Sequence, residues 1–258
     1  MPFFLSNLPM YDLAAGVATA GVLATGGYLY AGMAHSSQIF GTCAVAAGAP
    51  RQIALTFDDG PNEPYTRQLL DMLAEHQIRA TFFLIGQFVR QRPDLARAIA
   101  AGGHLIGNHS MTHPVLLLHS AKRVRAELRD CNAALEDVLG QPVRWFRPPY
   151  GARRPVVLRI ARELGLTPVL WNAMGYDWRK TTPEVVEGHV WRGFERNQRH
   201  GVASNVLLHD GGDKGLGQDR SHTIAATRAL IARWKRYFSE RDESCEFVTP
   251  EAWSLPSA

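Results

Sequence analysis

The stretch IALTFDDGPN, residues 53–62, places two adjacent carboxylates, Asp58 and Asp59, at the end of an apolar run. Burying an unpaired carboxylate is costly, and two neighbouring carboxylates repel each other. A bound cation offsets this repulsion, so one carboxylate can bind a metal while the other stays free as a base. Neighbouring side chains on a strand point to opposite faces, but both can reach one cavity where a strand bends into a loop.

The stretch GNHSMTHP places His109 and His113 four residues apart. Two imidazoles at this spacing can lie on one side of a helical turn and bind a single metal, although two solvated loop histidines are the plainer interpretation. Joined by one carboxylate of the Asp pair, they would form a facial site with positions open for water and substrate. We therefore expect a divalent metal, Zn²⁺ ahead of Co²⁺, Ni²⁺ or Mn²⁺.

The elements that must position these residues follow from an alternation that begins at Arg51. Short apolar runs predict strands at 52–57, 79–86, 104–109, 143–149, 167–173, 204–210 and 246–250, and amphipathic runs predict helices at 65–76, 93–103, 121–139, 155–164, 183–194 and 223–238. Such alternation is typical of a parallel sheet covered by helices. About seven βα units in about 200 residues favour a closed or nearly closed (β/α) barrel, with a doubly wound sheet as the alternative.

The polar residues with chemical potential fall where the expected strands end. Asp58 and Asp59 end the first strand, and His109 ends the third. Arg147 ends the fourth strand, and His209 ends the sixth. In a βα barrel these carboxyl ends meet on one face, which is where active sites form. The sequence therefore predicts that these distant residues line one pocket.

The first fifty residues differ from the rest in charge. No Lys or Arg precedes Arg51, and Leu13 to Ala34 is uncharged and long enough for one bilayer crossing. Three interpretations fit this segment: a membrane anchor, a signal-peptide-like segment, or a soluble N-terminal arm. Gly41 to Pro50 has the composition of a linker. We expect a hydrophobic segment and linker at 1–50, a catalytic domain at 51–250 and a short tail at 251–258, with an anchored or exported protein favoured over a cytoplasmic one.

Charge and cysteine content restrict the partners. The net charge of +4 is too small to indicate a nucleic-acid partner. Cys43, Cys131 and Cys245 form no CxxC pair, which argues against a structural zinc site, while a bridge between Cys43 and Cys245 would require export. Nothing in the sequence indicates an oligomeric state.

Five stretches in order, TFDDGPN, HSMTH, RPPYG, DW and LLHD, have the approximate spacing of the polysaccharide deacetylase family. This family is also called the NodB-homology domain or carbohydrate esterase family 4. The resemblance extends over about residues 51–250. It implies a distorted (β/α) barrel and metal-dependent removal of N-acetyl, and sometimes O-acetyl, groups from sugars.

The resemblance also implies roles for single residues. Asp59 resembles the metal-ligand Asp, with His109 and His113 beside it, and Asp58 resembles the catalytic base. Arg147 is similar to the Arg that orients this base.

Further roles concern the proton donor and the substrate. His209 resembles the general acid, and Tyr150 the residue whose backbone N–H helps to hold the oxyanion. Trp178 resembles an aromatic wall against the acetyl methyl, and Leu207 an apolar lining. The other expected substrate contacts are Pro149 and Asp177.

One position departs from the family pattern. The family has an Asp three residues before the Asp of the DW pair, where this chain has Met174. Either Asp177 takes over the contact with Arg147, or the base is tuned differently and the substrate is unusual, or the variant is simply tolerated.

The sequence leaves three functions in competition. The first is a metal-dependent N-deacetylase acting on an amino-sugar glycan such as peptidoglycan or a chitin-like polymer. The second uses the same scaffold to hydrolyse an O-acetyl ester or another non-peptide C–N bond. The third is a carbohydrate-binding pseudoenzyme. The presence of a base, metal ligands and an acid together argues against this third function.

Overall fold

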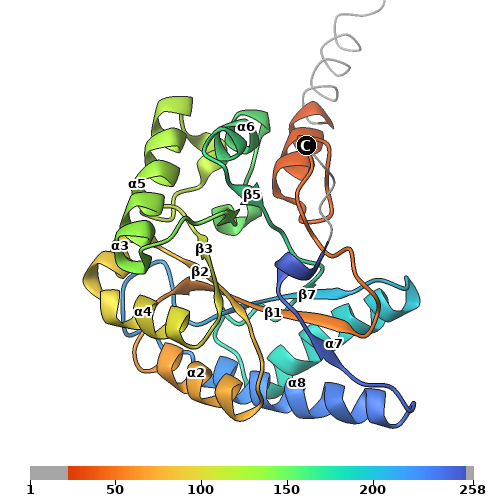
Figure 1. Ribbon diagram of the computed structural model, residues 1–258. Coiled ribbons are helices and arrows are strands. Elements are labelled where there is room, and N and C mark those ends of the chain that lie inside the picture. Colours follow the sequence, from red (N-terminus) through yellow and green to blue (C-terminus); the bar gives the residue numbers. More distant parts are fainter. Residues whose placement is uncertain (1–22, 254–258) are drawn as a thin grey trace, which may run out of the picture.

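The structure is a computed structural model that describes residues 23–253. Its centre is a curled sheet in which all the pairs formed are parallel, in the order β5-β4-β3-β2-β1-β7-β6, with β8 beside the start of β1 (Figure 1). The strands are β1 (Gln52–Gly60), β2 (Thr81–Leu84), β3 (Leu105–Asn108), β4 (Trp145–Phe146), β5 (Thr167–Pro168), β6 (Ala173–Met174), β7 (Ser204–His209) and β8 (Glu246–Phe247). This architecture confirms the distorted (β/α) barrel.

Helices surround the sheet and cover its outer face (Figure 1). They are α2 (Tyr65–Glu75), α3 (Gly86–Gln91), α4 (Pro93–Ala101), α5 (Ala121–Leu139), α6 (Pro155–Glu163), α7 (Pro183–Arg199) and α8 (Ser221–Ser239). The longest expected helix matches α5, whose ends the sequence marks clearly. The Ser120 hydroxyl accepts from the N–H of Arg123, and Gly140 ends the helix with a left-handed φ of 65°.

The barrel closes through one extended stretch that the sequence predicts as a single fifth strand at 167–173. Its first part, β5, pairs with β4 at one edge of the sheet, and its continuation, β6, pairs with β7 at the other edge. Each pairing is only two residues long. The expected strand is therefore divided into two short pieces, because each half has a different neighbour.

Strand β1 lies at the centre and is buried along almost its whole length. It pairs with β2 on one side and with β7 on the other, where Asp58 lies opposite His209. On the β2 side the register shifts between Asp58 and Gly60, so Asp59 has no partner in that ladder. An extra residue of this kind bends a strand and re-aims its side chains.

The sequence predicts a linker at Gly41 to Pro50, but in the structure these residues before β1 pack against the sheet. Ala44 forms a parallel bridge with Val169, and the side chain of Asn205 donates to the carbonyl of Val45 at 2.7 Å. This stretch therefore fills the seam between the two edges of the sheet. Its burial follows from small side chains, which let the backbone approach closely.

Residues 23–33 are helical and extend from the barrel beside α6 (Figure 1). Within residues 23–253, no helix combines the length and the apolar character needed to cross a bilayer. The expected anchor at Leu13 to Ala34 begins outside the described residues, so it stays a prediction. Cys43 and Cys245 are both free, which does not support the bridge suggested above.

Candidate active site

The Asp pair occupies the bulge at the end of β1. Asp59 has a left-handed φ of 70°, which an L-residue adopts only at a conformational cost. This turn of the backbone lets both Asp58 and Asp59 face one cavity. Gly211 approaches this bend so closely that a Cβ there would lie 2.1 Å from the carbonyl oxygen of Asp59. The backbone around the pair is therefore fixed on both sides.

Asp59, His109 and His113 form a compact buried group that fits a metal ion. Their ligand atoms all lie within 4.8 Å of one another. The Nε2 atoms of His109 and His113 lie 3.3 Å and 3.1 Å from Oδ1 of Asp59. Burial opposes ionisation of Asp59, but the neighbouring imidazoles of His109, His113 and His209 outweigh burial and hold the pKa of this carboxyl well below its usual value.

The tautomer of His109 also suits a metal ligand. Its Nδ1 lies 2.7 Å from the carbonyl oxygen of Arg147 and can only donate there. The lone pair of a neutral ring is then on Nε2, the atom that faces Asp59. An oxygen and two imidazole nitrogens that converge in this way match the donor set of a divalent metal site with open positions.

The two histidines reach this group through a loop, and not through the helical turn that their spacing suggested. Ser110 and His113 have left-handed φ values of 64° and 58°. The side chain of Asn108 accepts from the N–H of Ser110, and the Ser110 hydroxyl accepts from the N–H of His113. Side-chain acceptors therefore stabilise a backbone course that leaves the helical region.

Arg147 supports Asp58 from beneath the cavity. It is fully buried, and its Nη1 donates to Oδ1 of Asp58 at 2.8 Å and to the Thr56 hydroxyl at 2.7 Å. Its guanidinium lies 4.2 Å from the centre of the Phe83 ring. Burial lowers the pKa of Arg147, and the charge of Asp58 opposes this effect. Among the described residues, Asp58 is its only ion-pair partner.

His209 lies across the cavity and pairs with Asp177. Its Nδ1 is 2.8 Å from Oδ1 of Asp177, and its backbone N–H donates to the other oxygen of this carboxylate. Burial lowers the pKa of His209, but the charge and hydrogen bond of Asp177 outweigh burial and raise this pKa to about 9. Asp177 therefore acts on His209 and does not replace the missing carboxylate beside Arg147.

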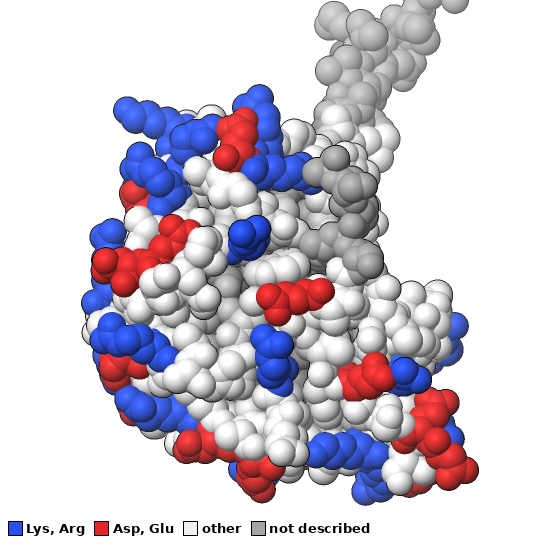
Figure 2. All heavy atoms as spheres, in the orientation of Figure 1, with Lys and Arg blue, Asp and Glu red and all other residues white. Residues whose placement is uncertain are grey.

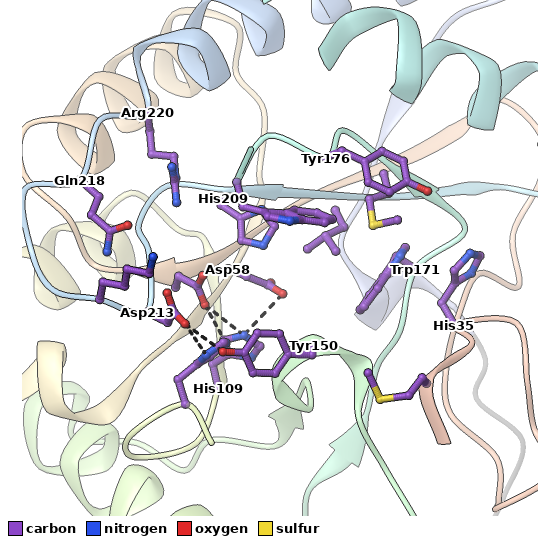
Figure 3. A pocket seen from close by; sticks show the side chains of 17 residues that line it. His35, Asp58, His109, Tyr150, Trp171, Tyr176, His209, Asp213, Gln218 and Arg220 are labelled. Atoms are coloured by element: carbon purple, nitrogen blue, oxygen red, sulfur yellow. Dashed lines mark hydrogen bonds and ion pairs between the residues drawn. The ribbon is translucent and has the colours of Figure 1, made fainter. Parts of the chain in front are cut away.

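The cavity has a volume of about 510 Å³, within the range of small-molecule sites. Figure 3 shows Asp58, His109 and His209 around its centre, with Gln218 and Arg220 toward one end and Trp171 and His35 toward the other. The residues of the cavity wall are Met33, His35, Asp58, Asp59, His109, His113, Tyr150, Trp171, Met174, Tyr176, Trp178, Leu207, His209, Asp213, Lys214, Gln218 and Arg220.

The expected substrate contacts differ in their placement. Trp178 and Leu207 line the cavity, and the Trp178 ring meets His209 edge-on at 5.3 Å. Pro149 and Asp177 are buried and do not line it. Pro149 instead begins the turn Pro149–Gly151, in which Tyr150 has a left-handed φ of 58°.

Several residues of the site were given no role from the sequence. The Asn62 side chain donates to the carbonyls of Asp210 and Gln218, both at 2.9 Å, and so joins the loop after β1 to the loop after β7. Asp213 accepts from the Tyr150 hydroxyl at 2.8 Å. Burial raises the pKa of Asp210 to about 7. Only the position of Asp210 directly after His209 pointed to such a residue.

Comparison with known proteins agrees with this geometry. Residues 46–169 match the family described as polysaccharide deacetylase. A chitooligosaccharide deacetylase of Rhizobium leguminosarum bv. trifolii is 38% identical over 203 residues, which cover 76% of this chain and 92% of the relative. The crystal structure of a peptidoglycan N-acetylglucosamine deacetylase has a TM-score of 0.70 and 27% identity, covering 81% of this chain and 92% of that one.

A pseudoenzyme of carbohydrate esterase family 4 from Bacillus anthracis is also similar, with a TM-score of 0.67 and 27% identity over 80% of this chain and 67% of that one. The fold and the site thus define a protein of the carbohydrate esterase class. More narrowly, the chain belongs to the polysaccharide deacetylase family, because the 38% identical relative is covered almost throughout.

Proposed function

We propose that the protein is a metal-dependent deacetylase that removes N-acetyl groups from an amino-sugar glycan. One observation carries this proposal. A buried Asp-His-His group, a second carboxylate held by a buried Arg, and an imidazole paired with an Asp all meet in one cavity. Amide hydrolysis needs these three parts: a site for a metal, a base and an acid.

Asp59, His109 and His113 would hold the metal, and Zn²⁺ suits two imidazoles and one oxygen best, with Co²⁺, Ni²⁺ or Mn²⁺ as alternatives. When bound, a divalent ion acidifies water and polarises the acetyl carbonyl. The donor set supports this choice because the His109 ring is already oriented by its Nδ1 contact.

The remaining residues would move protons and hold charge. Asp58 takes the proton of the attacking water, and Arg147 keeps this carboxylate oriented. His209 enters the reaction protonated and gives its proton to the sugar nitrogen as the C–N bond breaks. The Tyr150 backbone N–H helps to hold the oxyanion. Trp178 and Leu207 would contain the acetyl methyl.

The choice of an N-acetyl glycan rests on the relatives, which are named for chitooligosaccharide and peptidoglycan substrates. The mixed surface charge offers no continuous basic patch on the face shown in Figure 2, where Lys and Arg alternate with Asp and Glu. A neutral or weakly charged glycan fits this surface better than nucleic acid does.

The test is acetate release by metal-free protein and by protein reconstituted with Zn²⁺, Co²⁺, Ni²⁺ or Mn²⁺. The substrates are chitin oligosaccharides, peptidoglycan and acetylxylan. We expect activity only with metal, and on an N-acetyl substrate. Acetate from acetylxylan alone would make the protein an O-acetyl esterase. Oligosaccharide binding with full metal occupancy but no acetate from any substrate would make it a pseudoenzyme.

A further inference from the structure

One wall of the active-site cavity comes from the chain that precedes the family match at residues 46–169. Met33 and His35 line the cavity, whereas the family match begins at residue 46. We propose that residues 31–37 form a sugar subsite, in which Met33 and His35 contact the glycan unit next to the one that loses its acetyl group. This inference rests on the proposed function and identifies residues 31–37 as a determinant of substrate specificity.

The segment is held in place by Arg153, which is only 1% exposed. Its guanidinium donates to the carbonyl of Ala34 at 2.8 Å and also to that of Ser37. The backbone N–H of Arg153 donates to the carbonyl of Gly32 at 2.9 Å. Charge-assisted hydrogen bonds to several carbonyls fix a backbone firmly when the cation is buried. The segment is therefore part of the barrel.

Arg153 also connects this segment to the catalytic residues. Its Nη1 donates to the carbonyl of Gly151 at 2.9 Å, and Gly151 directly follows Tyr150. Gly32 packs so closely that a Cβ there would lie 2.9 Å from the carbonyl oxygen of Arg153. The position of residues 31–37 is thus set by the same turn that presents Tyr150 to the cavity.

The side chains of the segment suit the apolar face of a sugar ring. His35 stacks on Trp171, with ring centres 5.9 Å apart and an angle of 28° between the planes, and both rings lie at one end of the cavity (Figure 3). Met33 is 40% exposed although it is large and apolar. Burial and the nearby Arg196 lower the pKa of His35, so its ring is neutral near pH 7. Neutral rings and a thioether favour C–H contacts over charge.

Neither residue contacts the groups that carry out the reaction. Asp59 pairs with the two metal-ligand histidines, Asp58 with Arg147, and His209 with Asp177. His35 instead lies beside Trp171 at the far end of the cavity (Figure 3). A role in binding a neighbouring unit predicts an effect on KM that grows with substrate length. A role in the reaction would change kcat on every substrate.

The experiment uses the full chain and compares His35→Ala and Met33→Ala with the wild type. Ile39→Ala is the matched control, because Ile39 belongs to the same region, is 69% exposed and does not line the cavity. Acetate release is measured on chitin oligosaccharides of increasing length, and the position of the free amine is read by mass spectrometry. Calorimetry with the same oligosaccharides gives Kd independently of turnover.

We expect each of the two variants to raise KM and Kd for the longer oligosaccharides by about tenfold, with kcat, metal content and the shortest substrate unaffected. The position of the free amine should also become less uniform. Ile39→Ala should match the wild type throughout.

Unchanged KM and Kd at all lengths in an active enzyme would overturn the inference, as would an equal loss on the shortest substrate. If the wild type binds oligosaccharides in a His35-dependent way but releases no acetate, the proposed function fails and the subsite stands. Absence of both binding and turnover would overturn the two together. Met33→Ala keeps the test valid if His35→Ala unfolds, since Met33 is 40% exposed.

Discussion

The Nδ1 atom of His209 lies 2.8 Å from Oδ1 of Asp177. The second oxygen of this carboxylate accepts from the backbone N–H of His209 and from the Thr223 hydroxyl, both at 2.8 Å. Asp177 is fully buried and has no exposure to the cavity. Asp177 therefore fixes the ring orientation of His209 and favours its charged form. Because Met174 stands where the family has an Asp, Arg147 pairs with a single carboxylate, that of Asp58.

Replacing Asp177 should move the alkaline limb of the pH–rate profile. A general acid works only below its pKa, so activity falls as the pH rises through the pKa of His209, which Asp177 raises to about 9. Asp177→Asn keeps an acceptor for Nδ1–H but removes the charge. The limb should shift to lower pH, and at pH 8 the rate should fall by about tenfold or more.

A bound cation lowers this pKa in wild type and variant alike, so the direction of the difference is unaffected. Asp137→Asn, on the exposed side of α5, is the control and should leave the profile in place. Coincident alkaline limbs for Asp177→Asn and the wild type would show that His209 is not the acid.

Removing Arg147 should destabilise the fold as well as the site. In Arg147→Met the Asp58 carboxylate stays buried and loses its ion pair, which should lower the free energy of unfolding by about 3–5 kcal/mol. Arg147→Lys keeps a charge but lacks the second guanidinium nitrogen, which contacts the carbonyl of Leu170 at 3.4 Å, so its stability should lie between those of Arg147→Met and the wild type. Denaturant unfolding of metal-free protein measures this. Equal stability of Arg147→Met and the wild type would rule out the supporting role.

Crowding at the bulge of β1 should weaken the metal site from a distance. Gly211→Ala places a Cβ 2.1 Å from the carbonyl oxygen of Asp59, so the backbone of Asp59 must move. We expect the affinity for Zn²⁺ to fall by about tenfold or more, although no ligand is changed.

The matched control is Gly188→Ala in α7, where the nearest atom to the added Cβ is the end of the Arg192 side chain at 3.8 Å. It should leave metal affinity intact and raise stability by about 0.5–1 kcal/mol. If Gly211→Ala binds zinc as tightly as Gly188→Ala does, the bend at Asp59 is not what positions this ligand.

Sequence pattern predicted that residues far apart in the chain lie close together, and the structure places Asp58, His109 and His209 around one cavity with Arg147 against Asp58. Asp58, His109, Arg147 and His209 lie at the carboxyl ends of different strands, and parallel strands in a barrel have their carboxyl ends on one face. The helix from Ala121 to Leu139 was predictable because its amphipathic run is long and both ends carry capping residues.

Other features depend on tertiary contacts that no local pattern encodes. Helix α3 was missed because Gly86–Gln91 follows an apolar strand without a break in hydrophobicity. Helix α7 continues to Arg199 beyond the expected end, since no Gly or Pro stops it there. Met33 and His35 reach the cavity only because Arg153, far along the chain, binds the backbone beside them. The sequence alone also did not show whether Asp177 would pair with His209 at the end of β7 or with Arg147 after β4.

The most direct test of the proposed mechanism compares Asp58→Asn with Asp59→Asn by measuring zinc content and turnover on the same samples. If Asp58 is the base, Asp58→Asn should retain its metal and lose about 10²-fold or more in turnover. Asp59→Asn should bind zinc more weakly, because a neutral amide oxygen is a poorer ligand, and excess zinc should restore part of its activity. Metal loss in Asp58→Asn together with normal metal in Asp59→Asn would contradict the assignment of the two roles.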